Sequence, residues 1–335
     1  MNAAKNKSVD APPLWIMRQA GRTLPEYRAL REKYDFHTCM KTPELAAEIT
    51  MQPINRFGFD AAVIFSDILV VPEAMGMKVS FSPLTLTPAI KTGADIKAIK
   101  PYDPAEKIGY VAEALKETRK RLGEERALLG FCGAPYTLAC YMIEGASSKS
   151  FEKIKGFMFS NPREFGELMK ILAEADAEYL EMQAEAGADA VQIFDTWAGE
   201  LCESDFRAFV LPHLQELISR VKAKNIPIIY YINNIGNLLE AAKETGTDVI
   251  GLDWRVDMAR ARERLGKETS VQGNLDPLTL FAPAETIKKK VFELLDATGG
   301  KGHIVNLGHG LPPGVPLEGI ETFVRAVRAW SGEMR

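Results

Sequence analysis

The chain has 335 residues, of which 46% are hydrophobic and 26% are charged, proportions typical of a soluble globular protein with a large core. Its formal net charge of −4 argues against a nucleic-acid binder, because such proteins carry a basic excess. No apolar run approaches the roughly 20 residues of a membrane span, and residues 1–12 lack the apolar core of a signal peptide. We therefore expect a cytoplasmic protein that binds neither nucleic acid nor membrane. The four scattered cysteines suit reduced thiols: Cys39, Cys132, Cys140 and Cys202.

Apolar runs and helical stretches alternate along the chain after a tail, residues 1–12, that we expect to be disordered. The runs are nearly continuous in apolar residues, as in strands buried on both faces of a parallel sheet. The predicted strands are 61–65, 127–131, 190–194, 226–232, 249–254, 270–273 and 304–307, and the clearest helices are 105–121, 162–186, 205–224 and 284–295.

This alternation predicts right-handed βαβ units. Seven strands, with one missed, fit a single-domain (β/α)8 TIM barrel over residues 13–335, a length that such barrels reach. A doubly wound sheet is the alternative, which periodicity alone leaves open.

Small or polar residues follow nearly every predicted strand. In barrels the carboxyl ends of the strands form the rim on which active sites are built. The residues in question are Ser66-Asp67, Cys132-Gly133, Asp195-Thr196, Asn233-Asn234, Asp253-Trp254, Asn274-Leu275-Asp276 and Gly308-His309-Gly310.

The segment 13–22, PLWIMRQAGR, places Arg18 and Arg22 four residues apart across Gly21. A guanidinium stays charged at neutral pH and offers a planar donor fork that fits carboxylates or phosphates. Gly21 lets the backbone approach a ligand closely. The pair indicates a ligand with several anionic groups, although a solvated turn explains the spacing equally well.

Three further residues are candidates for chemistry. Asp67 lies between two apolar runs, where a carboxylate is costly unless it is paired or used, so it is either a structural cap or an anion that stabilises developing positive charge. His309 lies between two glycines that keep its surface open. Tyr141 is a candidate hydrogen-bond donor, with a place in the helical core as the alternative.

Motifs for nucleotide, zinc-hydrolase and serine-hydrolase chemistry are absent from the sequence: there is no GxGxxG after the first strand, no GxxxxGK[ST], no HExxH and no nucleophile elbow. The H-x-C spacing of His37 and Cys39 is interpreted as coincidence, because no suitable partner ligand follows.

Several motifs resemble those of the uroporphyrinogen decarboxylase family. The segment 13–22 matches its N-terminal signature, and 130–145 (GFCGAPYTLACYMIEG) is similar to its second signature. Further blocks match in the same order: 65–69, 251–254, 272–277 and 306–310. The family more often has an aromatic at Thr23, a glycine at Ala146 and a serine at Thr196, of which the last keeps its hydroxyl.

The resemblance implies a (β/α)8 barrel, usually a homodimer, that needs no cofactor or metal. It implies a carboxy-lyase that converts the four acetate side chains of uroporphyrinogen III to methyls, giving coproporphyrinogen III in haem and tetrapyrrole biosynthesis. Asp67 then corresponds to the transition-state stabiliser, and Arg18 and Arg22 are catalytic as well as binding residues. The implied substrate contacts are Arg18, Gln19, Ala20, Gly21, Arg22, Asp67, Tyr141, Thr196 and His309.

Two other functions remain open at this stage. Corrinoid-dependent methyltransferases share the barrel but use zinc held by late histidine and cysteine ligands, and this sequence has no cysteine after Cys202. A non-catalytic tetrapyrrole binder is the second alternative, although the matched polar residues are all present.

Overall fold

The central element of the computed structural model is a curled sheet of seven parallel strands, joined in the order β1-β4-β5-β6-β7-β8-β9. The structure describes residues 1–7 and 9–333; residue 8 of the expected tail and residues 334–335 of the expected barrel domain lie outside this range. The strands are β1 (Ala61–Val63), β4 (Ala127–Gly133), β5 (Ala190–Asp195), β6 (Ile228–Ile232), β7 (Val249–Gly251), β8 (Ser270–Leu275) and β9 (His303–Leu307).

All seven predicted strands are confirmed as members of this sheet. Within this sheet, neighbouring strands follow one another in chain order, whereas a doubly wound sheet reverses its order at a switch point. The doubly wound alternative is therefore wrong.

The segment around Leu14, before helix α1, lies between the two outer strands of the sheet, β1 and β9. Its Leu14 forms a parallel bridge with Val305 of β9, and the Val305 amide donates to the Pro13 carbonyl at 2.8 Å. On its other side the Leu14 amide donates to Oδ2 of Asp60, immediately before β1, at 2.7 Å. The N-terminal motif is thereby held against both edges of the sheet.

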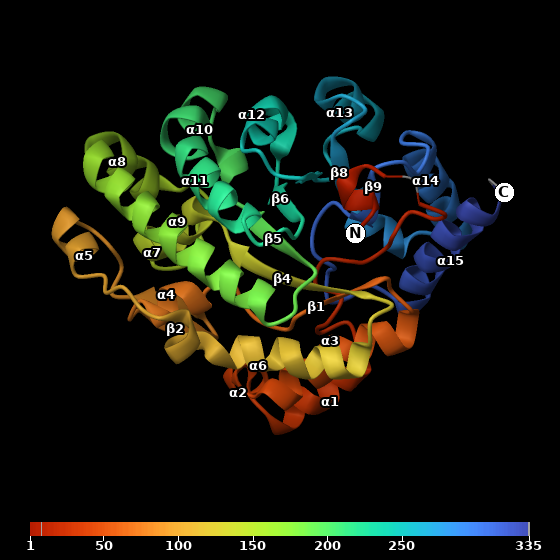
Figure 1. Ribbon diagram of the computed structural model, residues 1–335, viewed down its shortest axis with the longest axis horizontal. Coiled ribbons are helices and arrows are strands. Elements are labelled where there is room, and N and C mark those ends of the chain that lie inside the picture. Colours follow the sequence, from red (N-terminus) through yellow and green to blue (C-terminus); the bar gives the residue numbers. More distant parts are fainter. Residues whose placement is uncertain (8, 334–335) are drawn as a thin grey trace.

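Helices cover the outside of the sheet (Figure 1). No helix in the described residues is long and apolar enough to cross a membrane. The α-helices are α1 (Pro25–Lys33), α2 (Phe36–Lys41), α3 (Pro43–Phe57), α4 (Val70–Ala74), α5 (Gly93–Lys97), α6 (Pro104–Leu122), α7 (Pro135–Glu144), α8 (Glu152–Ser160), α9 (Pro162–Glu185), α10 (Glu203–Phe209), α11 (Leu211–Lys222), α12 (Leu239–Glu244), α13 (Met258–Leu265), α14 (Ala284–Asp296) and α15 (Leu317–Glu333). Four 3-10 helices are also described: η1 (Ala3–Lys5), η2 (Ala198–Glu200), η3 (Ile235–Asn237) and η4 (Pro277–Phe281).

One predicted helix needs correction, and one hairpin has no counterpart among the predictions. The helix expected over 205–224 is two helices, α10 and α11, separated at Val210, because Pro212 has no amide hydrogen to continue the first helix. A hairpin of β2 (Lys78–Phe81) and β3 (Leu84–Thr87) was not predicted, since each of its strands is only four residues long.

The tail expected to be disordered is ordered over residues 3–5, which form η1. Ala3 and Ala4 are buried, and the Ser270 hydroxyl donates to the Ala3 carbonyl at 3.0 Å. Their small apolar side chains fit beside the base of the strands, an arrangement that composition alone does not reveal.

Side chains from alternate positions of the strands fill the interior of the curled sheet, as in a barrel. A polar pair crosses this interior, where Gln272 donates to Gln192 at 2.9 Å and accepts from the Trp15 indole at 3.1 Å. The apolar cluster comprises Ala3, Ala4, Trp15, Met17, Ala61, Leu129, Ala190, Ile229, Tyr231, Val249 and Ile304.

Candidate active site

A pocket of about 430 Å³ opens at the carboxyl ends of the strands, within the size range of small-molecule sites. Every site residue predicted from the sequence lines it: Arg18, Gln19, Ala20, Gly21, Arg22, Asp67, Tyr141, Thr196 and His309. The fold thus brings the N-terminal motif, the end of β1 and the loop after β9 to one place. Their catalytic and binding roles stay predictions.

The N-terminal motif is held in the pocket wall by its backbone. The Met17 amide donates to the buried Asn306 side chain at 3.0 Å, and the Met17 carbonyl accepts from the Leu311 amide at 2.8 Å. The Gln19 side chain accepts from the Ile16 amide and donates to the Ala61 carbonyl, so both halves of its amide fix the turn.

Arg18 has a left-handed backbone, with φ of 63°, and its side chain is exposed in the pocket. Its aliphatic stem runs against Gly310, where a Cβ would overlap it. The neighbouring Arg22 is also exposed. Two guanidinium groups are thus available on one wall for anionic groups of a ligand.

Asp67 follows β1 and lies at the start of the turn into α4. Its Oδ1 accepts from the Leu69 amide at 2.9 Å, whereas Oδ2 has no protein partner among the described residues. Burial raises the pKa of Asp67 from its ordinary 3.8 to about 6, a shift that the Leu69 hydrogen bond and the charge of Arg18 oppose. At neutral pH it is a carboxylate with one oxygen open to the pocket.

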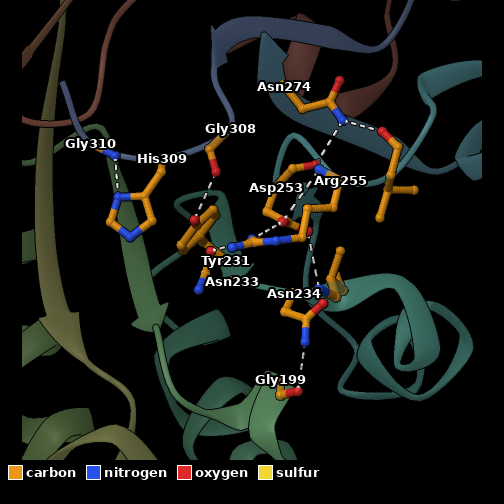
Figure 2. Close-up of polar contacts among 12 residues, drawn as sticks. Gly199, Tyr231, Asn233, Asn234, Asp253, Arg255, Asn274, Gly308, His309 and Gly310 are labelled. Atoms are coloured by element: carbon orange, nitrogen blue, oxygen red, sulfur yellow. Dashed lines mark hydrogen bonds and ion pairs between the residues drawn. The ribbon is translucent and has the colours of Figure 1, made fainter. Parts of the chain in front are cut away.

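His309 is neutral at pH 7, because burial and the nearby charges of Arg18 and Arg255 lower its pKa to about 4. Its Nδ1 accepts from the Gly310 amide at 2.6 Å, which places the proton of the neutral ring on Nε2 (Figure 2). The ring packs edge-on against Tyr231 and Trp254, with centroid distances of 6.3 and 6.0 Å. His309 is therefore a fixed, neutral hydrogen-bond donor.

Tyr141 and Thr196 form the wall between α7 and β5. Burial raises the pKa of Tyr141, so its hydroxyl stays protonated, and its ring meets Trp197 edge-on at 6.2 Å. Thr196 follows the buried Asp195, whose carboxylate accepts from Thr137 and Tyr230, each at 2.7 Å. Thr196 thus adjoins a buried network, and Tyr141 is positioned by its contact with Trp197.

Tyr231, for which no role was predicted, lines the pocket and donates from its hydroxyl to the Gly308 carbonyl at 2.8 Å. The signal was the alternation within β6, which places Ile229 and Tyr231 on the inner face. The continuous apolar run of that strand hides this alternation. Phe131 and Phe194 also line the pocket, and no polar signal marks them.

No group of three or more His, Cys, Asp or Glu side chains within 1–7 and 9–333 is arranged to hold a metal ion. His37 and Cys39 lie in α2 and do not line the pocket. Cys39, Cys132 and Cys140 are buried and Cys202 is exposed, and none of the four forms a disulfide.

Comparison with known families gives one assignment. The model of the family described as uroporphyrinogen decarboxylase (URO-D) matches residues 1–330. The chain belongs to the uroporphyrinogen decarboxylase family. This match confirms the resemblance that the sequence motifs indicate. Uroporphyrinogen decarboxylases are carboxy-lyases.

Relatives from this family align along nearly the whole chain. The uroporphyrinogen decarboxylase of Geobacter metallireducens is 46% identical over 334 residues, which is 99% of this chain and 98% of the relative. The enzyme of Chloroflexus aggregans is 45% identical over 339 residues, covering 98% of this chain and 95% of the relative.

A solved structure with a similar fold is a methyltransferase from Methanosarcina mazei, with a TM-score of 0.84 over 98% of this chain and 96% of that chain. The two sequences are 23% identical, so the likeness concerns the fold alone. It agrees with an α/β fold built on a curled parallel sheet.

Proposed function

We propose that this chain removes the carboxyl groups of the four acetate side chains of uroporphyrinogen III and so makes coproporphyrinogen III, without a cofactor, in haem and tetrapyrrole biosynthesis. The observation that carries the proposal is that one half-buried carboxylate, Asp67, lines the same pocket as the guanidinium groups of Arg18 and Arg22. The eight carboxylates of this substrate match the positive guanidinium groups, and its four pyrrole N–H groups match the negative carboxylate.

The reaction needs an electron sink, which a pyrrole can supply itself. Protonation of a ring carbon gives a cationic ring; the bond from the acetate methylene to its carboxylate then breaks, CO₂ leaves, and the electron pair moves into the ring. A proton added to the resulting exocyclic methylene and one lost from the ring carbon complete a methyl group, so each acetate consumes one proton net. Asp67 facing the pyrrole N–H groups stabilises the cation more than the neutral ring, which is the differential stabilisation that raises a rate.

The other residues hold the substrate. Arg18 and Arg22 bind acetate and propionate carboxylates through their planar forks. His309 donates from Nε2, and Tyr141 and Thr196 add neutral donors elsewhere in the lining. A guanidinium is a poor acid, so the arginines act chiefly through charge.

We also infer that the segment around Leu14 takes the place of an eighth strand between β9 and β1 and so completes a (β/α)8 barrel. Its hydrogen bonds to both edges of the sheet support this inference.

A homodimer in the cytoplasm follows from the family resemblance, and light scattering tests the dimer.

The decisive experiment incubates the protein anaerobically with uroporphyrinogen III and separates the products by carboxyl number. Products with seven down to four carboxyl groups are expected, and Asp67→Asn should abolish them while retaining substrate binding. Unchanged substrate would favour a tetrapyrrole binder, and stoichiometric bound zinc in the purified protein would favour the methyltransferase alternative.

A further inference from the structure

A third arginine, Arg255, lies beside the wall of the pocket that carries His309. It follows β7 in the turn that leads to α13, and its side chain is 46% exposed. After burial and Arg18, the charge of Arg255 helps lower the pKa of His309, and it offsets part of the rise that burial causes in the pKa of Tyr231; both residues line the pocket. Asp253 and Trp254 next to it are among the predicted strand-end residues, whereas no role was predicted for Arg255.

The turn that carries Arg255 is rigidly held (Figure 2). Asn274 donates from Nδ2 to the carbonyls of Asp253 and Val256, at 2.9 and 2.7 Å. The fully buried Asp253 carboxylate accepts from the Ile235 amide at 3.2 Å. The backbone at Arg255 is therefore fixed before any ligand arrives, which lowers the entropic cost of binding.

The guanidinium is fixed as well. Nη1 donates to Asp253 at 2.6 Å and to Asn233 at 3.1 Å, and the group stacks on the Trp254 ring with its carbon 3.9 Å from the centroid. Nε and Nη2, which form the other edge of the fork, have no partner within the described part of the chain. An oriented fork with one open edge is the arrangement that binds a carboxylate bidentately.

Trp254 connects this fork to the known wall of the pocket. Its ring face contacts Arg255 and its ring also packs at 6.0 Å from the ring of His309. The turn and the loop after β9 lie so close that a Cβ on Gly308 would overlap the Trp254 backbone. The open edge of Arg255 and the Nε2 proton of His309 therefore belong to the same rim.

We propose that Arg255 is a further substrate-binding residue, which holds one propionate carboxylate of the tetrapyrrole at this rim. The proposal rests on the proposed function for the identity of the ligand. A propionate is favoured over a reacting acetate because Arg255 lies outside the pocket lining, whereas the acetate that loses CO₂ must lie near Asp67. Arg18 and Arg22 then bind carboxylates on one side of the substrate, and Arg255 binds a different carboxylate, that of one propionate.

The test compares Arg255→Gln, Arg255→Lys and a control, Arg264→Gln. Arg264 is a comparably exposed arginine on α13, and it pairs with Glu240 on α12 instead of facing the pocket. Anaerobic assays give the KM and kcat for uroporphyrinogen III. The Kd is measured for coproporphyrinogen III, which keeps the four propionates but has no acetates.

In Arg255→Gln, both the KM and the Kd should rise about tenfold, equivalent to about 1.4 kcal/mol of binding free energy, with a smaller change in kcat. Arg255→Lys keeps a cation for Asp253 but loses the fork, so its Kd should rise by a smaller factor. It tests the proposal even if the glutamine variant fails to fold. Arg264→Gln should change neither quantity.

The proposal is overturned if the coproporphyrinogen Kd is unchanged in both Arg255 variants. If the KM for uroporphyrinogen III rises while this Kd stays unchanged, Arg255 contacts an acetate and the propionate contact is wrong. It is also overturned if only kcat falls, since that would mean a purely structural role. If the unmodified protein binds coproporphyrinogen but leaves uroporphyrinogen intact, the proposed decarboxylation fails, and the propionate contact is judged on the Kd alone.

Discussion

The stem of Arg18 crosses Gly310 so closely that any side chain on the glycine would occupy the same space. The two residues come from opposite ends of the chain, and their contact aims the guanidinium into the pocket. The glycine after His309 is thus part of what positions the N-terminal motif.

Gly310→Ala should displace Arg18 and lower kcat/KM about tenfold or more, because misplacing a binding group by about 1 Å has a large effect on rate. The loop after β9 offers a control in Gly314→Ala, since no atom lies within 4 Å of a Cβ at that position. Steady-state rates of the two variants check the prediction, and equal losses would mean that the loop matters in general and the Arg18 contact does not.

The activity should fall as the pH drops through about 6. Asp67 must be ionised to stabilise a cation, and its pKa in the free protein is about 6, so protonation removes the essential charge at that pH. A pH profile of kcat/KM from pH 5 to 8 measures this. Asp195 also has a pKa of about 6, and Asp195→Asn separates the two groups: it should keep the acidic limb if Asp67 is responsible.

The strands and the position of the pocket could be predicted from the sequence, because buried parallel strands are long apolar runs and polar residues end them. Asp67 and His309 were found because a polar residue beside such a run is conspicuous. Tyr231 was missed because its strand is apolar on both faces, so its inward position leaves no pattern. The contact of Arg18 with Gly310 depends on how the chain ends meet in space, and local sequence does not encode it.

Asp67→Asn should make the folded protein more stable while abolishing its activity. The folded-state pKa of about 6 exceeds the ordinary 3.8, so folding holds this proton more tightly, and the free energy of unfolding falls as pH rises from about 4 to about 6. At pH 7 the variant should gain about 1–2 kcal/mol, less than the full two-unit shift gives at about 1.4 kcal/mol per unit, because the carboxylate is open to the pocket. Denaturant unfolding at pH 7 and pH 4 checks this, and a gain that persists at pH 4 would contradict it.

In the buried network around Asp195, in contrast to Asp67, a substitution that removes a polar group should destabilise the folded protein. Thr137→Val removes one of the two side-chain donors to Asp195, and a buried carboxylate that loses a donor costs about 1–3 kcal/mol of unfolding free energy. Thr118→Val is the matched control, because the buried Thr118 hydroxyl bonds only to the Ala114 carbonyl of its own helix.

The Thr137 hydrogen bond lowers the pKa of Asp195, so it favours the ionised form, and its loss matters most when Asp195 is charged. The destabilisation in Thr137→Val should therefore be large at pH 7.5 and smaller at pH 5, below the folded-state pKa of about 6. Denaturant unfolding at both pH values measures the difference. Equal destabilisation at the two values, or an equal effect of Thr118→Val, would show that the charge on Asp195 does not set the cost, since Thr137→Val also removes the acceptor of the Trp197 amide.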